Sequence, residues 1–159
     1  MTARGDVAPV PPKRESLMHV SWAGEHRFDT GRPNGPVARL DGSGQTGQSP
    51  PDALLSALAT CSAVDVVDIL GKRRTPPARL SVEVRGVRRE EMPRRFTELH
   101  LAYHIDGAGI DAIHVERAIS LAFEKYCSVA ASLAPDIVVK TTAIVNGVAA
   151  TAKPQTIRG

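Results

Sequence analysis

The stretch SPPDALLSALATCSAVDVV, residues 49–67, contains the strongest helix signal in the chain. Ser49 can cap a helix, and Asp52 stands in the capping-box position three residues later. No helix breaker occurs from Ala53 to Leu70, and apolar residues recur there at helical spacing. The sequence therefore predicts a long helix that ends near Gly71. Because the helix is so apolar, we expect it at the centre of the core or of a dimer.

The strands and a second helix are predicted from patterns on either side of this stretch. Alternating apolar and polar residues predict five strands, at 19–28, 37–40, 80–85, 96–105 and 137–145. A second long helix is predicted from its cap, Asp111, to about Leu133. This order predicts an α+β fold in which two long central helices pack against one antiparallel sheet.

The composition of the 159-residue chain is that of an ordinary globular protein, with 42% hydrophobic and 23% charged residues. We expect one folded domain over residues 16–147, a disordered Pro-rich leader over residues 1–15 and a flexible tail over residues 148–159. No secretory signal and no uninterrupted apolar run of about 18 residues is found, so we expect a cytoplasmic protein without a membrane partner. The net charge of +3 and the 4% aromatic content argue against nucleic-acid binding.

The only two cysteines, Cys61 and Cys127, each fall in one of the two predicted helices. Packed helix axes lie roughly 8–10 Å apart, so thiols that face inward can come within disulfide range. The alternative is that each is a buried thiol that packs as a small hydrophobic side chain. A metal pair of His100 and His104 is not expected, because four residues on a strand span ~13 Å.

Three further side chains are candidates for a site around Cys61. A reactive thiol needs a nearby cation, and Arg32 in the turn at residues 30–36 is a candidate, with a solvated turn residue as the alternative. Asp52 precedes Cys61 by nine positions, which is ~13.5 Å along a continuous helix. Asp52 is therefore expected to cap the helix unless a partner subunit brings it to the site. Asp65, four residues after Cys61, is a candidate for a dimer contact or a polar network.

Two motifs resemble the cysteine helices of the OsmC/Ohr family. The first is residues 49–67 around Cys61, which are closest to the OsmC-like branch, and the second is residues 115–129 around Cys127. The resemblance covers about residues 18–147. It implies an OsmC-like fold built as an intertwined homodimer, in which each chain adds strands to a joint sheet.

The resemblance also implies a function in oxidative stress defence. The implied activity is a cysteine-dependent peroxidase that reduces organic hydroperoxides and, as a further expected substrate, hydrogen peroxide. Cys61 would form the sulfenic acid and Cys127 would condense with it to a disulfide, which a dithiol reductant, such as a lipoyl-type dithiol, would reduce. No metal or organic cofactor is implied.

The chain departs from the peroxidase branch at one position. That branch has a glutamate ten residues before the first cysteine, where this chain has Pro51, with Asp52 one step further along. Arg32 is similar to the arginine that the branch carries in its early turn. The alternative is an OsmC-like binding protein for a small hydrophobic ligand, without peroxidase turnover.

Overall fold

The computed structural model describes residues 14–158, which form two compact units, one up to Pro50 and one from Pro51 onward. The chain length had suggested a single domain over residues 16–147. The leader expected over residues 1–15 lies outside the described residues, apart from its last two positions.

The first unit is a three-stranded antiparallel sheet in the order β1-β2-β3, made of β1 (His19–Trp22), β2 (Arg27–Gly31) and β3 (Ala38–Asp41). The prediction of one strand over residues 19–28 is wrong, because Gly24 and Glu25 take positive φ angles of 95° and 51° and turn the chain back on itself. The predicted hairpin between β2 and β3 is confirmed. Over residues 14–50 no hydrophobic side chain is buried.

The second unit is built on a larger sheet in the order β4-β5-β6-β7, with β8 also paired to β6. Its strands are β4 (Arg79–Arg88), β5 (Phe96–Asp106), β6 (Val138–Val145), β7 (Val148–Ala149) and β8 (Lys153–Gln155). The predicted antiparallel pairing holds for β4 and β5, whereas β5 and β6 are parallel, because the helical segment between them returns the chain to the same end of the sheet.

The tail expected to be flexible after Gly147 is built into this sheet. β7 and β8 pair with β6, and the Ile157 side chain, only 4% exposed, belongs to the core. The sequence of this segment did not predict these strands, because its small and polar residues lack the alternating pattern of a strand.

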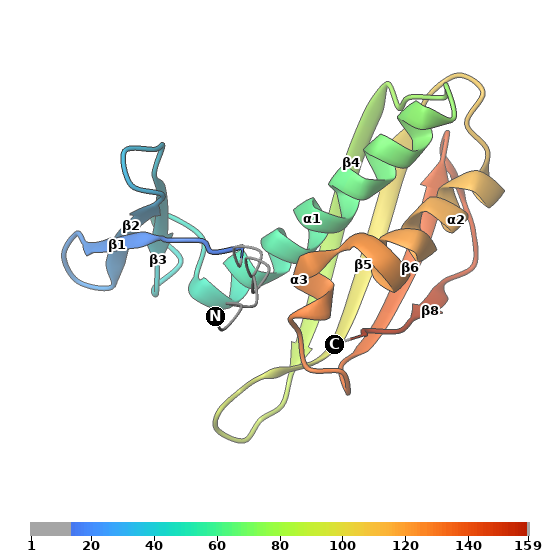
Figure 1. Ribbon diagram of the computed structural model, residues 1–159. Helices are drawn as coiled ribbons and strands as arrows, with labels where there is room; N and C mark the ends of the chain where they lie inside the picture. Colours follow the sequence, from blue (N-terminus) through green and yellow to red (C-terminus); the bar gives the residue numbers. More distant parts are fainter. Residues whose placement is uncertain (1–13, 159) are drawn as a thin grey trace, which may run out of the picture. The chain divides into compact units, whose positions relative to one another are not determined.

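The helices lie on one face of the sheet of the second unit (Figure 1). α1 (Pro50–Lys72) follows the prediction closely. The second predicted helix is not continuous: α2 (Ala112–Leu121) runs into a π-helix, η1 (Ala122–Tyr126), and α3 (Ser128–Ala131) follows. The break is at Cys127, whose φ and ψ of −71° and 101° are extended rather than helical.

The core lies between this helical layer and the sheet. It includes Leu58, Val66 and Leu70 of α1, Val115 and Ile119 of α2, and Leu99, Leu101, Tyr103 and Ile105 of β5, all 3% exposed or less. By length and composition alone α1 could cross a membrane, but core helices of globular proteins pass the same test. Away from the sheet, α1 leaves Leu54, Val64 and Val67 between 42% and 54% exposed.

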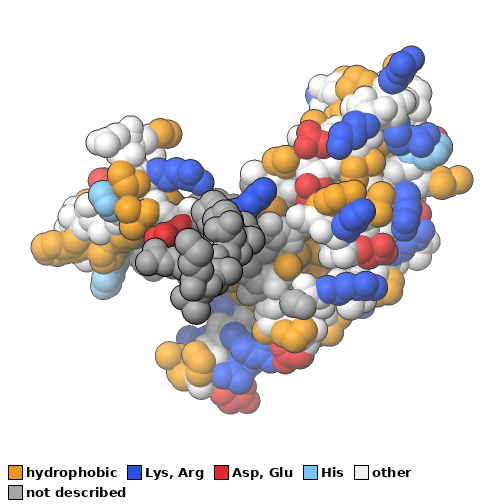
Figure 2. All heavy atoms as spheres, viewed as in Figure 1, with side chains coloured by type: hydrophobic (Ala, Val, Ile, Leu, Met, Phe, Trp, Pro, Cys, Tyr) orange, Lys and Arg blue, Asp and Glu red, His pale blue; other side chains and the backbone are white. Residues whose placement is uncertain are grey.

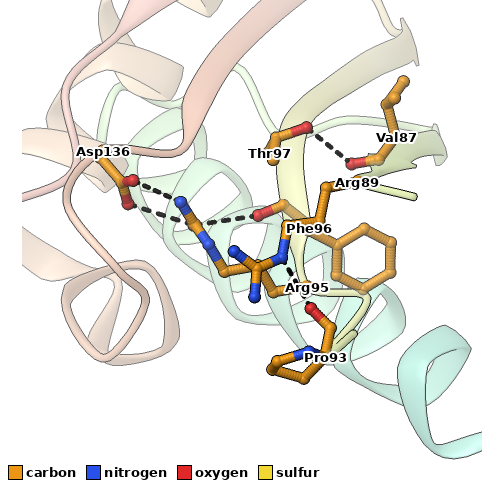
Figure 3. Close-up of polar contacts among 7 residues, drawn as sticks. All are labelled: Val87, Arg89, Pro93, Arg95, Phe96, Thr97 and Asp136. Atoms are coloured by element: carbon orange, nitrogen blue, oxygen red, sulfur yellow. Dashed lines mark hydrogen bonds and ion pairs between the residues drawn. The ribbon is translucent and has the colours of Figure 1, made fainter. Parts of the chain in front are cut away.

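An ion pair ties the β4–β5 connection to the segment that precedes β6 (Figure 3). The guanidinium of Arg95 contacts both carboxylate oxygens of Asp136, at 2.5 and 3.2 Å, and also donates to the carbonyl of Phe96 at 3.3 Å. Within the connection, Nε of Arg89 donates to the carbonyl of Pro93 at 2.8 Å. These bonds hold together two parts of the chain that are 41 positions apart.

Candidate active site

The structure brings the two thiols side by side. Cys61 lies near the middle of α1 and is partly exposed, whereas Cys127 lies at the junction of η1 and α3 and is 3% exposed. The Cys61 side chain lies close enough to Cys127 to add to the raised pKa of that thiol, which burial chiefly causes. Both side chains pack in the same core, Cys127 within it and Cys61 at its partly exposed edge.

Local backbone structure positions Cys127. Its N–H donates to the carbonyl of Ala122 at 2.7 Å, which closes the π-helix, and its sulfur accepts from the N–H of Ala130 at 3.4 Å, which caps α3. Burial raises the pKa of Cys127 to about 11; the Ala130 amide opposes this shift and Cys61 adds to it. Cys127 is therefore a protonated thiol at neutral pH.

A buried hydrogen bond fixes the helix that carries Cys61. The hydroxyl of Tyr103, on the central strand β5, lies 2.6 Å from Oγ of Ser62, the residue after Cys61. Ser62 Oγ also reaches two backbone carbonyls one turn earlier, at 3.0 and 3.1 Å, whereas no second acceptor is found for the Tyr103 hydroxyl among the described residues. We therefore assign Tyr103 as the donor between the two hydroxyls. The bond holds α1 against rotation about its axis, with Cys61 on the side of Cys127.

The pKa of Tyr103 reports what surrounds this hydroxyl. Burial raises the pKa, the bond to Ser62 opposes the shift, and the nearby groups Cys127 and Asp65 add to it. Sequence reasoning had placed Tyr103 on the apolar face of its strand and missed this role. A tyrosine on a buried face requires a hydrogen-bond partner, and that was the available signal.

Asp65 lies one helical turn after Cys61. Its Oδ2 is buried and has no hydrogen-bond partner among the described residues. Burial raises the pKa of the carboxyl, and the charge of Asp68 adds to the shift.

Asp52 precedes Cys61 by nine positions on α1, and a role for it in the chemistry of Cys61 remains a prediction. Asp52 is exposed in the first turn of α1 and lines a groove of about 490 Å³ between α1 and β4, and Cys61 is not among the residues that line it. Arg32 is exposed in the turn between β2 and β3, in the first unit, and its part in the chemistry stays a prediction. Over residues 14–158, no group of three or more His, Cys, Asp or Glu side chains is placed to hold a metal ion.

Comparison with known proteins defines the class. The sequence profile of the OsmC-like protein family matches residues 42–142, which include both cysteines. Over 115 residues, which are 72% of this chain and 86% of the relative, the chain is 39% identical to Protein YhfA of Escherichia coli strain K12. The chain therefore belongs to the OsmC-like family, as its two cysteine motifs suggested.

Solved structures agree on the fold. A hypothetical protein of Aquifex aeolicus VF5 superposes with a TM-score of 0.76 at 27% identity, over 84% of this chain and 98% of that one. The organic hydroperoxide resistance protein OhrB of Bacillus subtilis superposes with a TM-score of 0.53 at 13% identity, over 84% and 98%. The OsmC-like fold predicted from the resemblance is thereby confirmed.

Proposed function

We propose that the protein is a thiol peroxidase that reduces organic hydroperoxides, with Cys61 as the attacking cysteine and Cys127 as the resolving one. The observation that carries the proposal is that a partly exposed thiol lies close to a buried one. A sulfenic acid formed at the first is met at once by the second, which protects it from further oxidation. Family membership and the shared fold with a hydroperoxide resistance protein support the same activity.

The unequal burial of the two cysteines supports the proposed order of the steps. Cys61 is the thiol that a peroxide can reach. Its sulfur attacks the terminal oxygen of ROOH, the O–O bond breaks, and the alkoxide leaves with the bonding electron pair and is protonated to ROH. Cys61 is then a sulfenic acid, oxidised by two electrons, and the peroxide has been reduced by two.

The second step joins the two sulfur atoms. The Cys127 sulfur attacks the Cys61 sulfur, the S–O bond breaks, and the hydroxyl leaves as water with the proton of the Cys127 thiol. We propose that a dithiol, of the lipoyl type, then reduces the disulfide by exchange at Cys61, the more accessible sulfur. The sum is ROOH plus a dithiol giving ROH, water and a disulfide.

Two surfaces favour a homodimer as the working form. The first unit buries no hydrophobic side chain over residues 14–50 and exposes Val20, Trp22 and Val37. Along α1, Leu54 and Val64 are exposed on a helix that is apolar around most of its circumference, and Figure 2 shows hydrophobic side chains at the surface of the helical face. We propose that a second copy covers both surfaces, because exposed apolar patches of this kind mark sites of protein interaction.

Turnover in solution tests the peroxidase. We expect the parent protein to consume cumene hydroperoxide with a lipoyl-type dithiol, the Cys61→Ser variant to be inactive, and the Cys127→Ser variant to form a sulfenic acid without a disulfide. The control is the double variant Cys61→Ser/Cys127→Ser, which has no thiol to oxidise. Peroxide consumption by Cys61→Ser at the parent rate would reject the assignment.

A second candidate function is favoured by the groove between α1 and β4. Its volume of about 490 Å³ and its mixed lining, with Leu55 and Val84 beside Asp52 and Ser56, match the size and chemistry of small-ligand pockets. If the protein binds a small hydrophobic ligand instead, native mass spectrometry should detect the purified protein with that ligand bound. The protein should then show no peroxide turnover with any dithiol.

A further inference from the structure

One carboxylate oxygen of Asp65, a partly exposed side chain, has no hydrogen-bond donor among the described residues. Its Oδ2 is buried and unpartnered among the described residues. The hydroxyls of Ser62 and Tyr103 bond to each other and to backbone carbonyls, and neither donates to this oxygen. A buried carboxylate oxygen without a hydrogen bond is costly, so a fold that keeps one there needs a reason.

The position of this carboxylate suggests the reason. Side chains four positions apart on a helix have Cβ atoms roughly 5–6 Å apart, which places Asp65 next to Cys61 on α1. The charge of Asp65 interacts with Asp68 on α1 and with Tyr103 on β5. Both neighbours are acids, so neither of them neutralises the carboxylate.

The geometry points to Asp65 as the residue that takes the proton of the Cys61 thiol and returns it to the leaving alkoxide, because its partnerless carboxylate oxygen is buried one helical turn from that thiol. This inference rests on the proposed peroxidase activity and adds the proton path that the activity needs.

The step balances. The Cys61 proton passes to the Asp65 carboxylate as the sulfur attacks the terminal oxygen of ROOH. The O–O bond breaks, RO⁻ leaves with the electron pair, and the Asp65 carboxyl protonates it to ROH. Asp65 ends as the carboxylate it was at the start, Cys61 is a sulfenic acid, and no further oxidant or reductant enters. The raised pKa of Asp65 suits a group that must both accept and release a proton.

A pair of peroxides separates a proton-transfer role from a structural one. tert-Butyl hydroperoxide expels an alkoxide, which needs a proton, whereas peracetic acid expels a carboxylate, which does not. In the Cys127→Ser background, single-turnover formation of the Cys61 sulfenic acid is measured with both. We expect Asp65→Asn to slow the reaction with tert-butyl hydroperoxide about a hundredfold and that with peracetic acid less than fivefold.

Two further variants complete the test. Asp68→Asn removes the neighbouring charge on the same helix and is expected to change both rates less than threefold. Asp65→Glu keeps the carboxyl group and is expected to restore part of the selective loss. Equal losses with both peroxides, or no loss with either, would overturn the role of Asp65. The proposed peroxidase itself would fail on a different result, namely unchanged peroxide consumption by Cys61→Ser.

Discussion

The Tyr103 hydroxyl donates to Oγ of Ser62 across 2.6 Å, and this bond joins the central strand of the sheet to the helix residue next to Cys61. Both residues are fully buried. The direction of the bond makes the two partners unequal, because Ser62 keeps its bonds to the backbone without Tyr103, whereas Tyr103 has no other acceptor among the hydrogen bonds found in residues 14–158.

This inequality predicts the stability of two variants. Tyr103→Phe should lower the free energy of unfolding by about 1 kcal/mol, and Ser62→Ala should lower it by more, about 2 kcal/mol, because it leaves a buried hydroxyl unpaired. Chemical denaturation measures both, with the half-exposed Tyr126→Phe as a control within about 0.5 kcal/mol of the parent. Equal effects of the two variants would contradict the assigned direction of the bond.

The resolving step should accelerate with pH. Burial raises the pKa of Cys127 to about 11, so its thiolate fraction rises about tenfold per pH unit between pH 7 and 9. Rapid quenching after one equivalent of peroxide, followed by intact mass, gives the rate of disulfide formation. A rate that does not change over this range would show that the Cys127 proton leaves before the rate-limiting step.

Removing the Asp65 charge should stabilise the fold while it slows the chemistry. A carboxyl whose pKa is raised on folding favours the folded state below its unfolded pKa and loses that contribution as pH rises through the folded value. Asp65→Asn should therefore gain roughly 0.5–1 kcal/mol over the parent at pH 7, falling to none near pH 3. Thermal unfolding of parent and variant at the two pH values measures the difference. A variant that is less stable at pH 7 would show that Asp65 holds the structure together.

If the protein is a homodimer through α1, substitutions on the exposed face of this helix should lower its oligomeric mass in solution. Val64→Glu or Val67→Glu places like charges on the exposed face of α1 and should dissociate the dimer, as measured by sedimentation or light scattering. Ile113→Glu, on the exposed side of α2, is the matched control and should stay dimeric. A parent protein that sediments as a monomer at micromolar concentration would reject the proposed assembly.

Local signals predicted the parts of the fold that depend on local structure. The capping residues and the unbroken apolar run specified α1, and alternation specified β4, β5 and β6. The π-helix was not visible, because residues 122–126 continue the apolar period of α2 and the break depends on how Cys127 packs. The turn between β1 and β2 was missed because Glu25 takes a positive φ that the sequence does not signal.

The site was predictable only in part for the same reason. Two cysteines in two helices suggested a pair, and in the structure Cys61 lies close enough to Cys127 to influence its pKa. The bond between Ser62 and Tyr103 joins residues 41 positions apart and depends on how the helix packs on the sheet. The unpartnered oxygen of Asp65 depends on that packing as well. Periodicity carries no information about such contacts.

The proposed redox pairing of Cys61 with Cys127 is tested most directly by counting thiols after one equivalent of cumene hydroperoxide. We predict the loss of both thiols, a mass two hydrogens lower, a Cys61–Cys127 cross-linked peptide within one chain, and one molecule of alcohol per chain. Two free thiols after the peroxide has been added, or a disulfide between chains in place of the one within the chain, would contradict the account.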